Sequence, residues 1–141
     1  MACFEYHGPV KGQARPRFDR RSGRAYEAKC MREYKAAIKA AYLEQVGKSF
    51  WGAPLEVSIH AYKPIARSTP KRVTLQAWKA KPDADNIAKA VLDALKGVAF
   101  DDDSQVVQLR VWKHVRTREQ QEGLTVYMWE AKENEGTEPG I

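Results

Sequence analysis

The alternation of hydrophobic and polar positions predicts two kinds of regular structure along this 141-residue chain. Apolar residues recur at every second position in some runs, which is typical of strands with one buried face. They recur at every third or fourth position in others, which is typical of amphipathic helices. The expected strands cover residues 2–7, 55–62, 106–114 and 124–130, and the expected helices cover residues 27–46 and 85–96. This order predicts a mixed α/β or α+β sheet with packed helices.

The limits of these elements are marked by residues that interrupt regular structure. Gly47 and Gly97 are expected to end the two helices, and Pro64 is expected to end the second strand. The connections at residues 8–26 and 65–80 have no apolar periodicity and are expected to be irregular. We predict a single domain of residues 1–131, followed by an acidic, glycine-rich tail of residues 132–141 that is expected to fray.

Composition excludes few classes of protein but narrows the setting. No apolar run approaches the ~20 residues that a membrane-spanning helix needs, and the first ten residues are too short and polar for a signal peptide. We therefore expect a soluble cytoplasmic protein with no membrane partner. Cys3 and Cys30 lack metal-ligand spacing and are expected to be reduced core thiols, although the sequence leaves a disulfide between them open.

The net charge of +6 conceals an asymmetry between the two halves of the chain. Residues 1–80 carry 16 Lys and Arg against 6 Asp and Glu, whereas residues 81–141 carry 8 against 12. A net charge alone fits a solvated surface equally well, but clustering favours a polyanion-binding function. The candidate phosphate-binding residues are Lys11, Arg15, Arg17, Arg20, Arg21 and Arg24, with Lys71 and Arg72 as secondary candidates.

The acidic residues are concentrated in one stretch, KPDADNIAKAVLDALKGVAFDDDSQVV, at residues 81–107. Two carboxylates ~4 Å apart repel by about 4 kcal/mol at an effective dielectric constant near 20. A folded chain removes this cost by protonation, by pairing with a cation or by binding a hard divalent metal. The stretch, in a basic protein, therefore suggests a metal-dependent enzyme that acts on nucleic acid.

Each part of this stretch also has a simpler interpretation. Asp85 is a natural N-cap for the following helix, and Lys89 is placed for an ordinary i,i+4 ion pair with it. Three aspartates in a row, Asp101, Asp102 and Asp103, are most often a solvated turn. We expect one of these three to approach Asp83 and Asp85 only if the following strand runs antiparallel to the helix.

The acidic stretch resembles the RusA family of Holliday junction resolvases, whose core pattern is K-P-D-x-D-N-x-x-K-A, then L-D-A-L, then D-D-[AS]-Q-V. The segments GPVKGQARPRF and RAYEAKCMREYKAAI also resemble the beginning and first helix of that family. Order and spacing agree across most of residues 4–130. In this chain Gln13-Ala14 is inserted before the Arg-Pro-Arg run, which leaves the exact roles of Arg15 and Arg17 open.

The resemblance implies a set of roles for individual residues. Asp83, Asp85 and Asp103 correspond to the essential metal-binding carboxylates and Lys89 to the catalytic lysine, while Asp102 matches the preceding family aspartate and Asp101 is an extra acid. The oxygen-only ligand set fits Mg²⁺, with Mn²⁺ as a substitute, better than zinc, because His7, His60 and His114 are scattered along the sequence.

The expected substrate is four-way junction DNA, and a junction that needs two incisions favours a two-fold homodimer. Trp51, Tyr62 and Trp112 are candidates for its interface. The resemblance implies a bacterial or phage-encoded enzyme of DNA recombination and repair. Two alternatives remain: a nuclease for other branched DNA, such as flaps or nicks, and a non-catalytic protein that binds branched nucleic acid.

Overall fold

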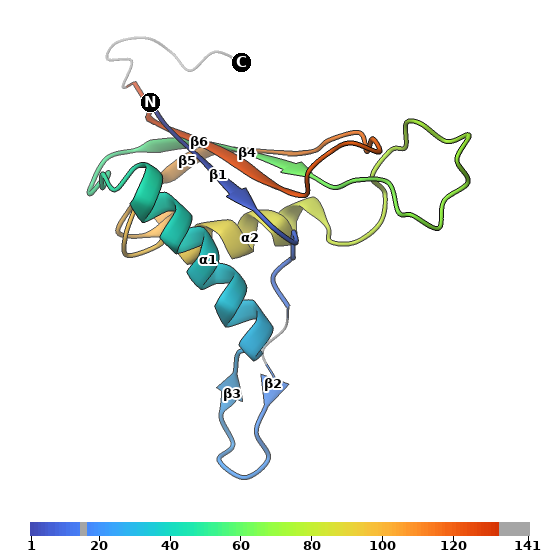
Figure 1. Cartoon of the computed structure of the whole chain (residues 1–141). Helices are drawn as coiled ribbons and strands as arrows, with labels where there is room; N and C mark the ends of the chain where they lie inside the picture. Colours follow the sequence, from blue (N-terminus) through green and yellow to red (C-terminus); the bar gives the residue numbers. More distant parts are fainter. Residues whose placement is uncertain (15–16, 133–141) are drawn as a thin grey trace.

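The computed structural model describes residues 1–14 and 17–132, and it confirms an α+β sheet with packed helices (Figure 1). The elements are β1 (Ala2–His7), β2 (Arg17–Phe18), β3 (Ala25–Tyr26), α1 (Lys29–Gln45), β4 (Leu55–Tyr62), α2 (Ala84–Leu95), the 3-10 turn η1 (Asp103–Gln105), β5 (Val106–Lys113) and β6 (Gly123–Glu130). Both helices lie on the same face of the four-stranded sheet, and β2 and β3 form a separate hairpin that projects from it.

The strand order is β1-β6-β4-β5, with β6 antiparallel to both of its neighbours and β4 parallel to β5. Parallel neighbours need a crossover connection, and α2 supplies it between β4 and β5. The chain therefore enters α2 at the end of the sheet where β5 finishes and leaves α2 at the end where β5 begins. This topology decides where the acidic residues lie.

The core lies between the sheet and the two helices. In β4 the side chains of Leu55, Val57, Ile59 and Ala61 are at most 1% exposed, as their alternation predicts. Helices α1 and α2 cover this face of the sheet, and their buried stripes belong to the same core cluster as the β4 side chains: Met31, Tyr34, Ile38 and Tyr42 in α1, and Ile87, Val91, Ala94 and Leu95 in α2. Each fully buried aliphatic side chain contributes about 1.5–3 kcal/mol, so this layer fixes the position of α2 against the sheet.

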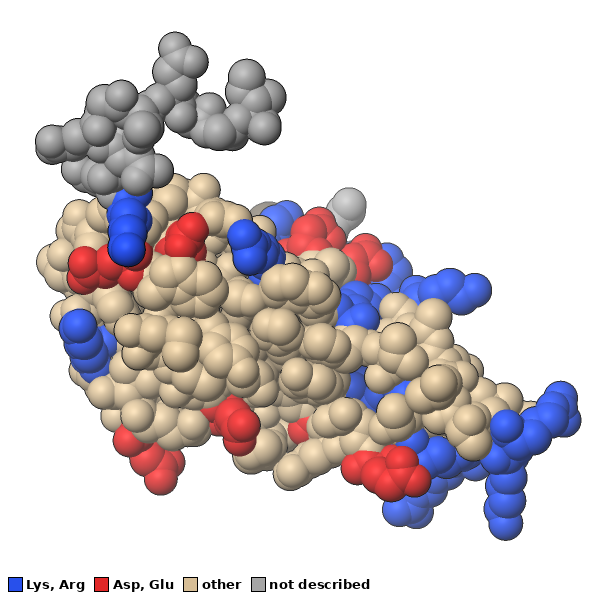
Figure 2. All heavy atoms as spheres, turned by 90° about the horizontal axis from the view of Figure 1, so that it is seen from above, with Lys and Arg blue, Asp and Glu red and all other residues tan. Residues whose placement is uncertain are grey.

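The other face of the sheet has no helix over it, and Figure 2 looks down onto it. The middle of this view is mainly uncharged, because the outward positions of the strands carry aromatic and small polar residues. His60 stacks on Trp112 with ring centroids 4.5 Å apart, and His114 stacks on Tyr62 at 4.6 Å. His60 Nδ1 lies 2.7 Å from His114 Nε2, so two histidines that are distant in sequence are in fact hydrogen-bonded neighbours.

The structure confirms the two expected helix ends and contradicts the expected burial of both cysteines. Gly47 and Gly97 have φ of 70° and 89° and follow the helix ends, as expected. The segment of residues 8–26 contains the hairpin β2–β3, which apolar periodicity did not reveal because its strands have only two residues each. Cys3 and Cys30 are unpaired but exposed, so the prediction of core thiols was wrong. The predicted tail, apart from Lys132, lies outside the described residues.

The long connection between β4 and α2 is irregular, as predicted, but arginines from the β5–β6 loop hold it in place. Arg116 donates two hydrogen bonds to the carbonyl oxygen of Pro64, and the Arg118 guanidinium donates to the carbonyl oxygens of Thr69, Pro70 and Val73. The connection ends at a cis peptide bond between Lys81 and Pro82. In the described part of the chain, no helix is both long and apolar enough to cross a membrane.

Candidate active site

The N-terminal end of α2 presents the first two candidate carboxylates. Asp83 occupies the N-cap position, and its carbonyl oxygen accepts the first helical hydrogen bond, from Ile87 N at 3.0 Å. The Asp83 side chain makes no capping hydrogen bond, and Asp85 lies in the first helical turn. The interpretation of Asp85 as the N-cap is therefore wrong. Both carboxylates are exposed and lie at the positive end of the helix dipole.

Two lysines surround the Asp83 carboxylate. Lys81 Nζ lies 3.0 and 2.9 Å from its two oxygens, and this hydrogen bond lowers the pKa of Asp83 and raises that of Lys81. The positive charge of Lys113, which ends β5, adds to the lowering of the Asp83 pKa. Lys113 itself donates to the carbonyl oxygen of Ala80 at 2.7 Å, and burial lowers its pKa. Asp83 is thus ionised and paired within its own chain.

The second group of carboxylates lies at the other end of α2, in the loop before β5. Asp102 caps η1: its side chain accepts from Ser104 N at 3.3 Å, and Lys96 Nζ is 3.3 Å from its carboxylate. The hydrogen bonds from Ser104, together with Lys96, lower the pKa of Asp102 to about 2. Asp102 is therefore a structural cap, while Asp103 begins η1 with an exposed side chain.

Gln105 positions this loop, a role that the sequence analysis missed. Its Oε1 accepts hydrogen bonds from Asp101 N at 2.7 Å and Asp102 N at 3.1 Å. Its Nε2 donates to the carbonyl oxygens of Phe50 at 2.8 Å and Ala53 at 2.9 Å. One side-chain amide thus joins the aspartate loop to the segment that precedes β4. The D-x-S-Q spacing, which matches a capping box, was the available signal.

Lys89 and Asp103 lie together in one surface cavity of about 270 Å³, which Gln13, Leu92 and Asp93 also line. Within the described residues, Lys89 makes no ion pair with Asp85, so the simple i,i+4 interpretation does not hold here. Among the side chains that the structure describes, none makes a hydrogen bond or ion pair with the side chain of Lys89, Asp85 or Asp103. Three charged groups are therefore free to bind a charged ligand.

The basic N-terminal segment packs against the same helix. Gln13 N donates to the carbonyl oxygen of Asn86 at 2.9 Å. A Cβ atom at Gly12 would lie 2.7 Å from Pro82 Cβ and 3.0 Å from Asn86 Cβ, so only glycine permits this approach. The first turn of α2 and the segment that precedes the hairpin therefore form one continuous surface.

In the described structure, Asp83, Asp85 and Asp103 are not brought together as one metal-binding group. Across residues 1–14 and 17–132, no group of three or more His, Cys, Asp or Glu side chains is placed to hold a metal ion. The crossover explains why: β5 runs antiparallel to α2, as we required, but this places Asp103 beside the later turns of α2 rather than beside Asp83 and Asp85. A helix of 12 residues spans about 18 Å at about 1.5 Å per residue.

Five of the six candidate DNA-binding residues whose side chains are described lie on two separate projections. Arg20, Arg21 and Arg24 are exposed around the turn of the hairpin, where Asp19 Oδ1 accepts from Arg21 N at 2.9 Å. Lys71 and Arg72 are exposed on the connection between β4 and α2, and Figure 2 shows Lys and Arg side chains extending at that end of the molecule. Lys11 is half-buried, Arg15 lies outside the described residues, and only the backbone of Arg17 is described.

Comparison with known proteins places this arrangement in a family. Residues 7–127 match the family described as endodeoxyribonuclease RusA. The chain is also 30% identical over 128 residues to the uncharacterized protein YqaN of Bacillus subtilis (strain 168), covering 80% of this chain and 88% of that protein. The family match includes the basic segment, the whole of α2 and the aspartate loop, so the resemblance noted in the sequence is confirmed. The chain belongs to the RusA endodeoxyribonuclease family.

Proposed function

We propose that this protein is a Mg²⁺-dependent, structure-selective endodeoxyribonuclease that resolves four-way DNA junctions by paired phosphodiester hydrolysis in recombination and repair. The family membership supports endonuclease activity in general. The observation that carries the proposal is that Lys89 and Asp103 line one cavity and, like Asp85, have no partner among the described residues. Unpaired charges of both signs on the same helix–loop surface match the needs of a phosphodiester substrate with a counterion.

The three proposed ligands are of the chemical type that a hard divalent cation binds. Asp83, Asp85 and Asp103 offer only carboxylate oxygens, the ligands that Mg²⁺ prefers, and all three are exposed. Mn²⁺ is expected to substitute. When bound, such an ion activates water for attack on phosphorus and neutralises charge on the leaving 3′-oxygen. Because the three carboxylates do not form one group in this structure, we infer that the aspartate loop moves, or that copies assemble, before all three act together.

Lys89 is the proposed source of positive charge for the phosphate oxygens. Its ammonium is exposed on α2 and is not neutralised by Asp85 in the described structure. A lysine beside a scissile phosphate stabilises the negative charge that develops on the phosphate oxygens during attack. Lys81, which now pairs with Asp83, would be released if that carboxylate took up a cation.

Binding of the junction is assigned to the two basic projections, and the protein is proposed to act as a homodimer. Each lysine or arginine that neutralises a phosphate releases counterions and steepens the salt dependence of binding. The hairpin and the long connection extend in different directions from the sheet, as an extended branched substrate would require (Figure 1). Trp51 and Trp112, which are 56% and 40% exposed, stay candidates for the interface between copies.

Cleavage of a labelled four-way junction with Mg²⁺ tests the proposal, using wild type, Asp85→Asn and Glu44→Gln. Glu44 is exposed near the end of α1, so Glu44→Gln matches the charge change and is expected to leave cleavage intact. Asp85→Asn is expected to bind the junction but lose cleavage, because it removes a proposed metal ligand. Cleavage by Asp85→Asn at the wild-type rate would contradict the assignment.

The same assay separates the alternative functions. A wild-type protein that binds the junction and never cuts any branched DNA would be a non-catalytic binding protein. Preferential cleavage of flaps or nicked duplexes would indicate a different structure-selective nuclease with the same site. Equal cleavage of linear duplex would reject selectivity for junctions.

A further inference from the structure

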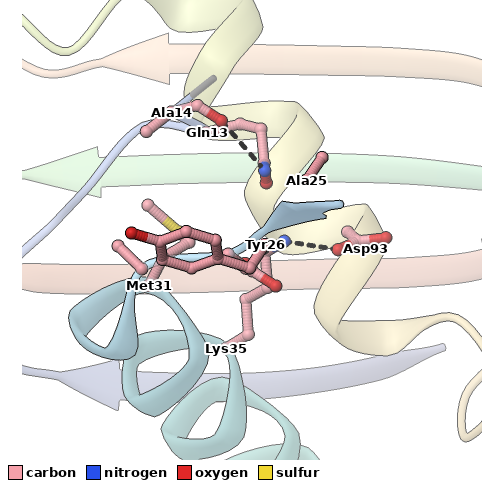
Figure 3. Close-up of a pocket in the computed structure, with 9 residues that line it drawn as sticks. Gln13, Ala14, Ala25, Tyr26, Met31, Lys35 and Asp93 are labelled. Carbon is pink, nitrogen blue, oxygen red and sulfur yellow. Dashed lines mark hydrogen bonds and ion pairs between the residues drawn. The ribbon is translucent and has the colours of Figure 1, made fainter. Parts of the chain in front are cut away.

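A second cavity lies beside the candidate active site, between the base of the hairpin and the two helices (Figure 3). Its volume is about 280 Å³, and the residues that give it its character are Gln13, Tyr26, Glu27, Met31, Lys35 and Asp93. The proposed catalytic roles use none of these side chains. The cavity is nevertheless contiguous with the site, because Gln13 and Asp93 also line the cavity that holds Lys89 and Asp103.

One wall of this cavity suits a flat, aromatic ligand. Tyr26 is 49% exposed although it lies in a strand, and Figure 3 shows its ring beside the side chain of Met31, which is only 4% exposed. An aromatic ring with an accessible face is a stacking platform, and stacking of one base on an aromatic side chain contributes roughly 1–3 kcal/mol. Three of the other lining residues are alanines, whose side chains are small.

The polar groups of the cavity are mainly acceptors of hydrogen bonds. Gln13 Oε1 is buried and has no hydrogen-bond partner among the described residues, while Gln13 Nε2 makes only a long contact of 3.4 Å with the carbonyl oxygen of Ala14. A buried acceptor without a partner costs roughly 1–3 kcal/mol. A ligand that donates an N–H group to Gln13 Oε1 would remove this cost, and Gln13 Nε2 is available as a donor beside it.

The charges of the cavity exclude a phosphate as its ligand. Lys35 Nζ, whose side chain is 11% exposed, lies 2.6 Å from Glu27 Oε1 and also pairs with Asp93. Two carboxylates share one ammonium, so the cavity carries an excess of negative charge, which repels phosphate and attracts N–H donors. An uncharged base with an exocyclic amino group fits this requirement, and a side-chain amide can pair with an amino group and an adjacent ring nitrogen at once.

We propose that this cavity receives one unstacked nucleobase of the DNA substrate, and that the base carries an exocyclic amino group. The proposal rests on the proposed function. A phosphate bound at Lys89 and Asp103 would bring the base of the same or the adjacent nucleotide to Gln13 and Asp93, which line both cavities. Taking a base out of a stack costs a few kcal/mol and is least costly where pairing is already disturbed, as at the centre of a junction. Gln13 and Tyr26 would then make cleavage depend on the base beside the scissile phosphate.

The first test replaces bases in a four-way junction. Each base flanking the mapped cleavage position is replaced by an abasic residue or by an analogue without its amino group, and single-turnover cleavage is measured for wild type, Gln13→Leu, Tyr26→Ala and Tyr26→Phe. We expect one position at which wild type loses about tenfold or more in rate, within the range for loss of an amide–base pair. Tyr26→Phe keeps this dependence, whereas Gln13→Leu and Tyr26→Ala lose it. Wild-type cleavage that is indifferent to every replacement would overturn the proposal and leave the nuclease function standing.

The second test does not depend on cleavage. Deoxycytidine, deoxyadenosine and thymidine are titrated separately into the full chain, and the side-chain amide of Gln13 is followed by NMR. We expect saturable shifts with the first two nucleosides and much smaller shifts with thymidine, which has no amino group. Absence of any shift at Gln13, or equal shifts with all three, would overturn the base-binding role even if the junction is cut. Shifts without junction cleavage would support the cavity and count against the proposed nuclease function alone.

Discussion

Removing the Gln105 side chain should loosen the aspartate loop and lower stability by an amount that the structure lets us work out. Gln105→Ala deletes two bonds donated to the part-buried carbonyl oxygens of Phe50 and Ala53 and two accepted from exposed N–H groups. Water replaces the exposed pair at little cost, whereas each part-buried bond contributes about 1 kcal/mol. With some lost packing, we expect destabilisation of about 2–3 kcal/mol, which lowers Tm by roughly 6–12 °C for a domain of this size.

The same change should impair cleavage, because Asp103 directly follows the residues that Gln105 holds. A misplacement of about 1 Å in a catalytic group can cost about 100-fold in rate, so we expect at least a tenfold loss below the new Tm. Gln105→Glu keeps Oε1 but puts a second oxygen against the two carbonyls, and it should be at least as destabilising as Gln105→Ala. Gln120→Ala is the control, because the only described hydrogen bond of that side chain is a long one of 3.4 Å. Wild-type Tm and cleavage in both Gln105 variants would refute this account of the loop.

Three further predictions follow from other contacts. Gly12→Ala places a Cβ 2.7 Å from Pro82 Cβ, so the segment must move away from α2; we expect junction cleavage to fall by at least tenfold, with unchanged cleavage counting against this packing. Burial lowers the pKa values of His60 and His114, so the folded state disfavours their protonated forms. We therefore expect Tm to fall as pH decreases below about 6.5, and a Tm that stays constant from pH 7.5 to 5 would contradict this. Arg21→Ala combined with Arg24→Ala should reduce the slope of log affinity against log salt by up to about 2, measured by anisotropy, and an unchanged slope would exclude phosphate contacts.

Much of the fold could be predicted from the sequence, because each strand and helix has its own period of apolar residues. The helix expected at residues 27–46 is present and buries a stripe of Met31, Tyr34, Ile38 and Tyr42, and the alternation in β4 holds on its core side. The hairpin was missed because pairs of two-residue strands are too short to show a period. The exposed thiols were mispredicted because Cys3 alternates with Phe4 and so faces away from the helices.

The candidate site could be predicted only in part, for a topological reason. Sequence spacing correctly places Asp83 and Asp85 at the start of α2 and Asp103 at the turn before β5. It does not show that β4 and β5 pair in parallel, which makes α2 a crossover helix and places Asp103 beside Lys89, Leu92 and Asp93. Tertiary contacts such as Gln105 with Phe50 join segments 55 residues apart, so no local pattern reveals them.

The strand order has a consequence for how the chain acquires its structure during synthesis. The last strand in the sequence, β6, lies between β1 and β4. Neither β1 nor β4 can therefore complete its pairing with β6 until residue 130 has been synthesised. Until then β1 and β4 expose apolar faces and free strand edges, which favour association with other chains. A nascent chain that stops before β6 should therefore aggregate or recruit chaperones, and folding should begin only after nearly all of the domain has left the ribosome.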